Sequence, residues 1–129
     1  MATKRSGATP AEWDVLETLW REAPLSAREV FDRMAPRRAA NPQTIRTLLD
    51  RLLAKNLVER RDAHGVWVFA PRKRRTEVVR EESRNFLKRF FGGEPALGAA
   101  YFIEHEKLSP GEIRRLNRLL DEKSDGARP

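Results

Sequence analysis

The stretch that decides the fold is residues 41–71, which run NPQTIRTLLDRLLAKNLVERRDAHGVWVFAP. Asn41 followed by Pro42 is typical of a helix N-cap and first helical residue. The apolar residues that follow recur at helical spacing: Ile45, Leu48, Leu49, Leu52 and Leu53. The pattern predicts a helix over residues 41–54 with one buried stripe and a polar opposite face.

After this helix the period changes to that of β-strands. Residues 57–61 and 66–70, which together hold three valines and two aromatic residues, are predicted strands, and residues 62–65 between them indicate a turn in which Gly65 supplies a positive φ. Pro71 ends the second strand. The sequence therefore predicts a two-stranded β-hairpin directly behind the helix.

Two further helices are predicted upstream. Thr9 with Glu12 and Ser26 with Glu29 have the spacing of capping boxes. The apolar stripes that follow them are Trp13, Leu16, Leu19 and Trp20 in the first helix, and Val30, Phe31 and Met34 in the second. Three helices and a hairpin are the order of a winged helix-turn-helix domain, which we place at residues 9–72 behind a basic arm at residues 1–8. We expect the three tryptophans, Trp13, Trp20 and Trp67, in its core.

Residues 73–121 are expected to form a second, helical domain, and residues 122–129 a flexible tail. Helical patterns cover residues 73–91 and 95–106, and Ser109 with Glu112 opens a last helix. The apolar side chains of this domain have few partners within it: Val79, Phe86, Leu87, Phe90, Phe91, Leu97, Tyr101, Ile113, Leu116 and Leu120. They either pack back on the winged domain or meet a second copy of the chain, and we favour a homodimer. The predicted fold class is mostly α with a small β-hairpin.

The basic charge is concentrated in the first part of the chain. The 129 residues carry a net charge of +7. Residues 1–75 hold 16 Lys and Arg against 9 Asp and Glu, whereas residues 76–129 hold 10 of each. Such an excess fits a nucleic-acid surface or a merely solvated basic face.

In a helix-turn-helix protein the second helix of the motif enters the major groove, which makes residues 41–54 the candidate reading helix. Its candidate base-reading residues are Gln43, Thr44, Arg46 and Thr47. Candidate phosphate or wing contacts are Arg37, Arg38, Asn41, Arg51, Arg60, Arg61 and His64. Each of the arginines and His64 also has a plainer interpretation as a solvated surface residue.

Other classes of function find no support in the sequence. The chain has no cysteine and two histidines far apart, His64 and His105, and it has no glycine-rich phosphate loop. We therefore expect no enzyme activity, no metal site and no cofactor. No apolar run is long enough for membrane insertion and no secretory signal is present, so we expect a cytoplasmic protein.

Three segments together resemble the penicillinase repressor family of the BlaI/MecI type. They are Ala11–Leu16 (AEWDVL), Thr44–Leu52 (TIRTLLDRL), and Phe86-Leu87 with Gly92-Gly93 downstream. The resemblance covers about Thr9 to Leu120. It implies a repressor whose winged domain binds inverted-repeat operators containing TACA and TGTA, and whose C-terminal helices form the dimer. It also carries groove contacts onto Thr44, Arg46 and Thr47.

The resemblance further implies release of the operator by a membrane sensor protease that cuts one bond in the dimerisation domain. By position that bond is Tyr101–Phe102 here, although staphylococcal members have Asn before the Phe. Copper-responsive relatives carry a C-terminal cysteine cluster, which this chain lacks. The alternative function is a winged-helix module that binds a protein and has no specific DNA target.

Overall fold

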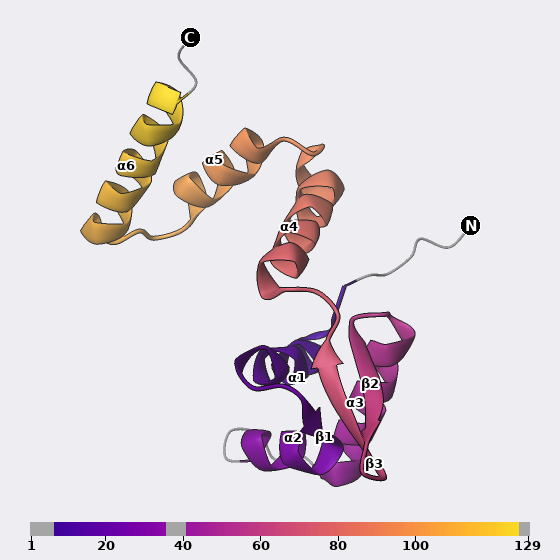
Figure 1. The fold of residues 1–129 in the computed structure, drawn as a ribbon. Coiled ribbons are helices and arrows are strands. Elements are labelled where there is room, and N and C mark those ends of the chain that lie inside the picture. Colours follow the sequence, from indigo (N-terminus) through magenta and orange to yellow (C-terminus); the bar gives the residue numbers. More distant parts are fainter. Residues whose placement is uncertain (1–6, 36–40, 127–129) are drawn as a thin grey trace. The chain divides into compact units, whose positions relative to one another are not determined.

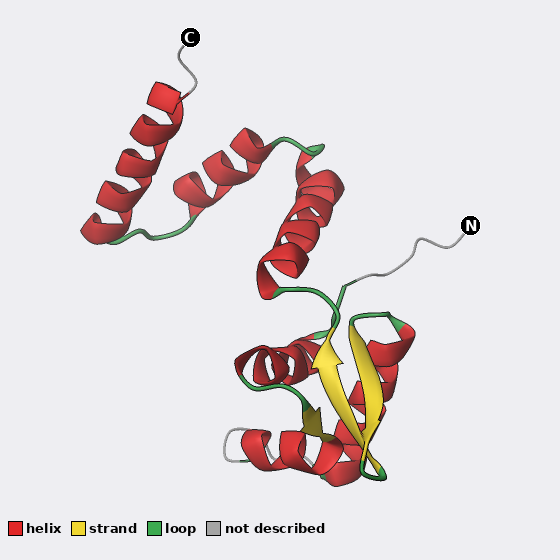
Figure 2. Ribbon diagram, viewed as in Figure 1, coloured by secondary structure: helices red, strands yellow, loops and turns green. Residues whose placement is uncertain are grey.

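The computed structural model describes residues 7–35 and 41–126 and divides into two units, the first ending at Glu82 and the second beginning at Ser83. The first unit contains α1 (Pro10–Arg21), β1 (Leu25–Ser26), α2 (Ala27–Met34), α3 (Pro42–Ala54), β2 (Val58–Ala63) and β3 (Val66–Pro71), then the start of α4 (Arg75–Phe91). The second contains the rest of α4, α5 (Pro95–His105) and α6 (Pro110–Gly126). Figures 1 and 2 show the elements; the predicted fold class, mostly α with a small hairpin in winged-helix order, is confirmed.

Capping boxes set the starts of α1 and α2, as their sequence spacing predicts. At α1, the Glu12 amide donates to Thr9 Oγ1 at 3.2 Å and the Thr9 amide donates to Glu12 Oε1 at 3.0 Å. Ser26 and Glu29 form the same pair of bonds at α2. Each box satisfies two amides that the first helical turn leaves without partners.

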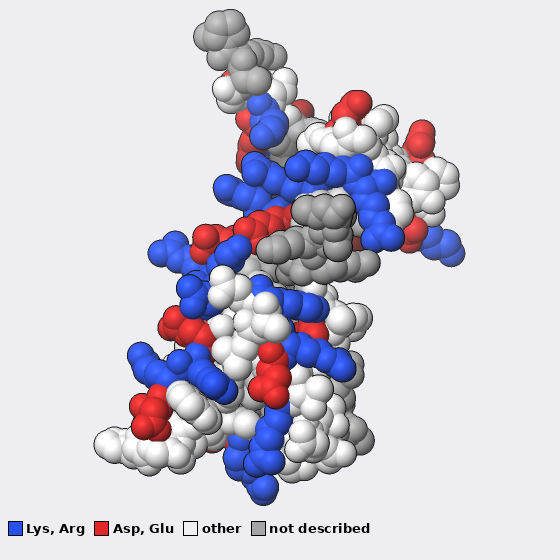
Figure 3. Space-filling model, turned by 90° about the vertical axis from the view of Figure 1, so that its right-hand side faces the viewer, with Lys and Arg blue, Asp and Glu red and all other residues white. Residues whose placement is uncertain are grey.

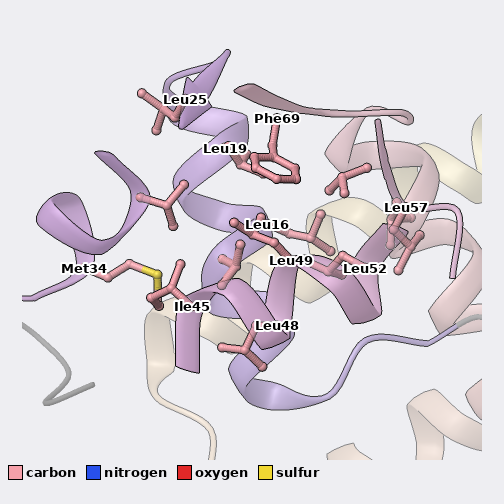
Figure 4. Close-up of a cluster of buried hydrophobic side chains, with 14 residues drawn as sticks. Leu16, Leu19, Leu25, Met34, Ile45, Leu48, Leu49, Leu52, Leu57 and Phe69 are labelled. Atoms are coloured by element: carbon pink, nitrogen blue, oxygen red, sulfur yellow. The ribbon is translucent and has the colours of Figure 1, made fainter. Parts of the chain in front are cut away.

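One apolar core holds the first unit together, and Figure 4 shows it from within. Helices α1, α2 and α3 supply most of it, and the sheet, α4 and the loop between α3 and β2 supply the remainder. Its buried members are Val15, Leu16, Leu19, Leu25, Val30, Met34, Ile45, Leu48, Leu49, Leu52, Leu57, Val58, Phe69 and Val78. Burial of each large aliphatic side chain stabilises the fold by about 1.5–3 kcal/mol. The stripe predicted for residues 45–52 faces this core.

The first unit extends past the predicted boundary at residue 72. Val78 on α4 is 1% exposed and belongs to the core, and Trp20 Nε1 donates to the Lys73 carbonyl at 2.9 Å. Arg75 also pairs with Glu17 of α1 at 3.0 Å. Since α4 is continuous from Arg75 to Phe91, no break in its helical pattern could mark the change of unit.

The sheet has three strands in the order β1-β3-β2, one more than the predicted hairpin. The added strand consists of two residues, and Leu25 lies opposite Phe69 in an antiparallel pair. Both side chains are buried in the core. A strand of two residues contains no period, so its pairing depends on the tertiary packing of Leu25.

Two backbone features lead from α3 into the hairpin, called the wing below (Val58–Pro71). At the end of α3 the Leu57 amide donates to the Leu52 carbonyl and the Asn56 amide donates to the Leu53 carbonyl, with φ of 63° at Asn56. This is a Schellman motif with asparagine in its left-handed position. At the wing tip His64 and Gly65 have φ of 54° and 85°, as a type I′ turn requires.

One expectation from the sequence is wrong. Trp13 and Trp20 pack against the core, but Trp67 is 51% exposed on the wing. At the other end of the chain, α6 continues through Gly126 and so includes the first residues of the segment that the sequence assigns to a tail.

A buried ion pair joins α1 to the end of α3. Glu12 is 1% exposed, and Lys55 Nζ donates to its Oε1 at 2.6 Å. Burial by itself raises the pKa of Glu12, but the hydrogen bonds from Lys55 and the Thr9 amide, with the positive charges of Lys55 and Arg51, outweigh it and hold this pKa below its usual value. The carboxylate is therefore the charged form in the folded protein.

We expect Lys55→Met to reduce the free energy of unfolding by about 2–4 kcal/mol and Glu12→Gln by about 1–2 kcal/mol. Methionine leaves a buried carboxylate without its partner, whereas Lys55 in the glutamine variant keeps contact with water because its side chain is 23% exposed. Urea unfolding at pH 7 measures both losses. Equal losses of unfolding free energy in the two variants would contradict the expectation that an unpaired Glu12 costs more than an unpaired Lys55.

The same pair predicts a pH dependence. The pKa of Glu12 is lower in the folded than in the unfolded chain, so its contribution to stability is present above the unfolded value near 4.5 and is lost as pH falls through the folded value. The stability difference between the wild type and Glu12→Gln should therefore shrink as pH falls below 4.5. A difference that stays constant down to full acid unfolding would refute this assignment.

Candidate nucleic-acid interface

Helix α3 has one buried face and one exposed polar face. Ile45, Leu48, Leu49 and Leu52 point into the core. The polar face begins in the first turn with Gln43, Thr44 and Arg46, which are exposed, and Thr47, which is half-buried. Their spacing of one, three and four residues places the four predicted base-reading residues on one side of the helix.

Hydrogen bonds within the first turns of α3 fix the threonines. Asn41 Oδ1 accepts from the Thr44 amide at 2.8 Å and from Thr44 Oγ1 at 3.1 Å. Thr47 Oγ1 donates to the Gln43 carbonyl at 3.0 Å. Both hydroxyl protons are thus engaged inside the helix, which leaves each threonine an acceptor lone pair and a methyl group for an outside partner.

The wing carries its charged residues on two different faces. In the antiparallel register Arg60 lies opposite Phe69, Asp62 opposite Trp67 and Arg61 opposite Val68. Because side chains alternate along a strand, Arg60 shares a face with Trp67 and Phe69, and Arg61 lies on the other. The Arg60 guanidinium carbon is 4.3 Å from the Trp67 ring centroid, which is the geometry of a cation–π contact.

A hollow of about 400 Å³ lies between α3, the start of α2 and the wing. Leu49 and Phe69 give it apolar lining, and Arg28, Arg46 and Arg60 surround it with positive charge. Asp50 and Trp67 also line it, from α3 and from the wing. The hollow therefore brings α3 and one face of the wing to a common surface, on which three arginines and one aspartate lie.

The other predicted phosphate or wing residues are more scattered. Arg51 is exposed, yet its charge contributes to the lowered pKa of Glu12 on α1. His64 is at the wing tip, whereas Arg37 and Arg38 lie outside the described residues. Figure 3 shows one face of the molecule, on which Lys and Arg side chains are interspersed with acidic ones and reach the lower end of the first unit, at the height of the wing tip in Figure 1.

The residues predicted for dimerisation are largely open to solvent in the single chain. Val79, Phe86, Phe90, Leu97, Tyr101, Ile113 and Leu120 are exposed, and Leu87, Phe91 and Leu116 are half-buried. Within the second unit Phe86, Phe91, Tyr101 and Phe102 form an aromatic cluster whose ring centroids are 5.7–6.5 Å apart in the contacting pairs. A Cβ added to buried Gly98 would meet the Leu87 side chain at 2.7 Å, so α5 packs closely on α4 there.

Sequence reasoning missed Trp67 and Arg28 as parts of the surface around the hollow. In the strand register Trp67 and Arg60 are diagonal neighbours. The residue pattern does not show how far the wing extends beyond the core, and therefore does not show that Trp67 is exposed. Arg28 lies in the first turn of α2, far from α3 in sequence, and carries no local signal.

Residues 7–35 and 41–126 contain neither a metal-binding cluster nor a membrane-spanning helix. No group of three or more His, Cys, Asp or Glu among them is arranged to hold a metal ion. None of the helices formed by these residues has the length and apolar character needed to cross a membrane.

Comparison of the sequence with known families gives one match over nearly the whole chain. The family model described as penicillinase repressor matches residues 8–122. The penicillinase repressor of Staphylococcus aureus is 27% identical over 95% of this chain and 97% of its own length. That of Bacillus licheniformis is 29% identical over 87% and 88%. The methicillin resistance regulatory protein MecI of Mammaliicoccus sciuri is 28% identical over 95% and 100%.

Solved structures agree on the fold. The DNA-binding domain of the repressor BlaI, determined in solution, superposes with a TM-score of 0.51 at 23% identity and covers 60% of this chain and 93% of its own. The YusO protein of Bacillus subtilis also gives 0.51, at 22% identity over 95% and 78%. These likenesses confirm a winged-helix architecture.

The N-terminal geometry of α3 predicts a specific stability effect. We expect Asn41→Ala to reduce the free energy of unfolding by about 1 kcal/mol, because it removes the acceptor of the Thr44 amide. Asn41→Asp keeps an acceptor at the same position and should cost far less. Thermal unfolding measures both; an alanine variant as stable as the wild type would rule out the cap.

Proposed function

Because the chain belongs to the penicillinase repressor family, we propose that it represses transcription by binding an inverted-repeat operator of the TACA/TGTA type as a homodimer. The observation that carries the proposal is the exposed face of α3, where Gln43, Thr44, Arg46 and Thr47 stand together opposite the core stripe. The resemblance noted in the sequence is confirmed at the level of the family.

The chemistry of this face suits base edges in a major groove. The Arg46 guanidinium matches the O6 and N7 acceptors of guanine, and the Gln43 amide matches N6 and N7 of adenine. The methyl groups of Thr44 and Thr47 suit the thymine methyl, since the hydroxyl protons of both residues are already engaged within the helix. The start of α3 would receive a phosphate beside Asn41.

Phosphate contacts would come from the remaining cations of the first unit. Arg28 and Arg60 line the same hollow as Arg46, and Arg51 and Arg61 are exposed. Each phosphate that a protein neutralises releases counterions and steepens the salt dependence of binding. The same cations would not distinguish one DNA sequence from another.

The apolar surface of the second unit supports the homodimer. Phe90 is 59% exposed, Leu97 50% and Leu120 61%, and these helices bury no large apolar side chain completely among the residues described from Ser83 to Gly126. Side chains of this size need a partner that excludes water, and a two-fold copy presents the same surface in return. The dimer then places two reading helices on one inverted repeat.

Release of the operator would follow from loss of this dimer. The Tyr101–Phe102 bond lies inside α5, and both rings belong to the aromatic cluster with Phe91. Cleavage there by a membrane sensor protease would leave Tyr101 on one fragment and Phe102 with α6 on the other, and so would divide the cluster. A monomer holds one half-site and loses the high effective concentration for the second.

The reading face is tested by binding to a labelled TACA/TGTA inverted repeat and to a scrambled duplex at physiological salt. We expect nanomolar, selective binding by the wild type. Arg46→Ala should lose about 1–3 kcal/mol on the inverted repeat and much less on the scrambled duplex. Arg21→Ala, which removes the same charge from the exposed end of α1, is the matched control and should bind as the wild type does.

Equal losses on both duplexes for Arg46→Ala would make Arg46 a phosphate contact. Absence of DNA binding, or binding insensitive to salt, would contradict the repressor and favour a winged-helix module that recognises a protein.

The homodimer is tested by sedimentation velocity of the full chain. We expect Phe90→Glu to shift the wild-type dimer toward monomer at micromolar concentration, because a carboxylate would enter the apolar interface. Asn85→Glu adds the same charge at a polar, exposed position of α4 and should leave the dimer intact. A wild type that sediments as a monomer would contradict the proposal.

A further inference from the structure

Trp67 is the one tryptophan of the chain that lies outside the core, and its surroundings suggest why. Half of its surface is open, on a wing that extends beyond the core, while Trp13 and Trp20 pack against that core. Its ring lies beneath the guanidinium of Arg60 at 4.3 Å. The ring therefore packs against a guanidinium at the surface, whereas the other two tryptophans pack against the core.

The contact between Trp67 and Arg60 crosses the wing. The two residues are diagonal neighbours on β2 and β3, since Arg60 lies opposite Phe69, two residues along from Trp67. Phe69, the next residue on this face, is buried. Arg60 and Trp67 therefore lie on the same face of the wing as buried Phe69 but farther from the core, and this face lines the hollow together with α3.

Besides Arg28 of α2, the hollow brings an arginine of α3 and an arginine of the wing to one surface. Arg46 stands on the exposed face of α3 and Arg60 on the inner face of the wing, and both line the same hollow of about 400 Å³. Arg61 follows Arg60 in sequence but lies on the opposite face of β2 and does not line it. The register thus distinguishes two arginines that the sequence alone treats alike.

We propose that Trp67 is a positioning residue that holds Arg60 on the α3 side of the wing, so that Arg60 and Arg46 bind one continuous stretch of the operator. The inference rests on the proposed DNA-binding function and deepens it. In this arrangement Arg60 contacts the backbone next to the bases read by α3, and Trp67 contributes through Arg60.

The physical reason is preorganisation of the guanidinium. An arginine on an exposed strand samples many rotamers and loses that freedom when it binds a phosphate. A ring beneath its flat face restricts the side chain beforehand, while the N–H groups at the guanidinium edge stay free to donate in the plane. Lysine cannot replace it, because its ammonium has neither the plane nor the fork.

The experiment is a double-mutant cycle on the full chain, with affinity for the inverted repeat measured as a function of salt. The variants are Arg60→Ala, Trp67→Ala, their combination, Trp67→Phe and Arg60→Lys. We expect Arg60→Ala to bind about tenfold more weakly and to lower the slope of log affinity against log salt by about 0.9. Trp67→Ala should lose about three- to fivefold, and the double variant no more than Arg60→Ala alone.

Conservative changes and a matched control make the result specific. Trp67→Phe keeps an aromatic face and should restore most of the affinity that alanine loses, whereas Arg60→Lys should not match the wild type. Arg61→Ala combined with Trp67→Ala should show losses that multiply, since Arg61 lies on the other face of the wing. Thermal unfolding of each variant separates loss of the wing from loss of contact.

Two outcomes overturn the inference while leaving the repressor in place. If the affinity losses of Arg60→Ala and Trp67→Ala multiply in the double variant, Trp67 contacts DNA by itself. If Trp67→Ala binds with wild-type affinity, the contact between Trp67 and Arg60 does not contribute to binding. In both cases Arg46→Ala still weakens selective binding. Failure of the wild type to bind the inverted repeat selectively is instead a failure of the proposed function.

Discussion

The buried stripe of α3 is the constraint on which the rest of the first unit depends. Ile45, Leu48, Leu49 and Leu52 fill the centre of the core, and α1, α2 and the sheet pack around them. Their burial fixes the rotation of the helix about its own axis. Gln43, Thr44 and Arg46 must then face solvent, because a helix cannot turn them inward without exposing its leucines. Stability and the candidate recognition surface are thus set by the same thirteen residues.

Local signals predicted most of what this stripe organises. Capping boxes at Thr9 and Ser26 and the asparagine before Pro42 have short-range causes, and the helices begin where these residues indicate. The turn at Gly65 is equally local, since its positive φ is needed in a two-residue loop. Such features can be predicted from the sequence because the residues that make them lie within a few positions of one another.

Features that depend on distant parts of the chain could not be predicted from the sequence. β1 exists because Leu25 meets Phe69 across the unit, and the first unit includes the start of α4 because Val78 completes its core. Trp67 was expected in the core because a tryptophan in an apolar strand is usually buried. Its exposure depends on how far the wing extends past α3, which strand period does not encode. The pairing of Arg60 with Trp67 follows from the same register and was missed with it.

The two units differ in how complete they are, and this difference suits a switch. The first unit buries its apolar side chains in a core of its own, so it does not need a second chain for its stability. The second leaves Phe90, Leu97 and Leu120 open, and in the proposed repressor a second copy covers them. The free energy of pairing then resides in a part of the chain that makes no base contact. A signal that damages only that part would leave the reading face intact and would still release the operator, since the second half-site is held only through the dimer.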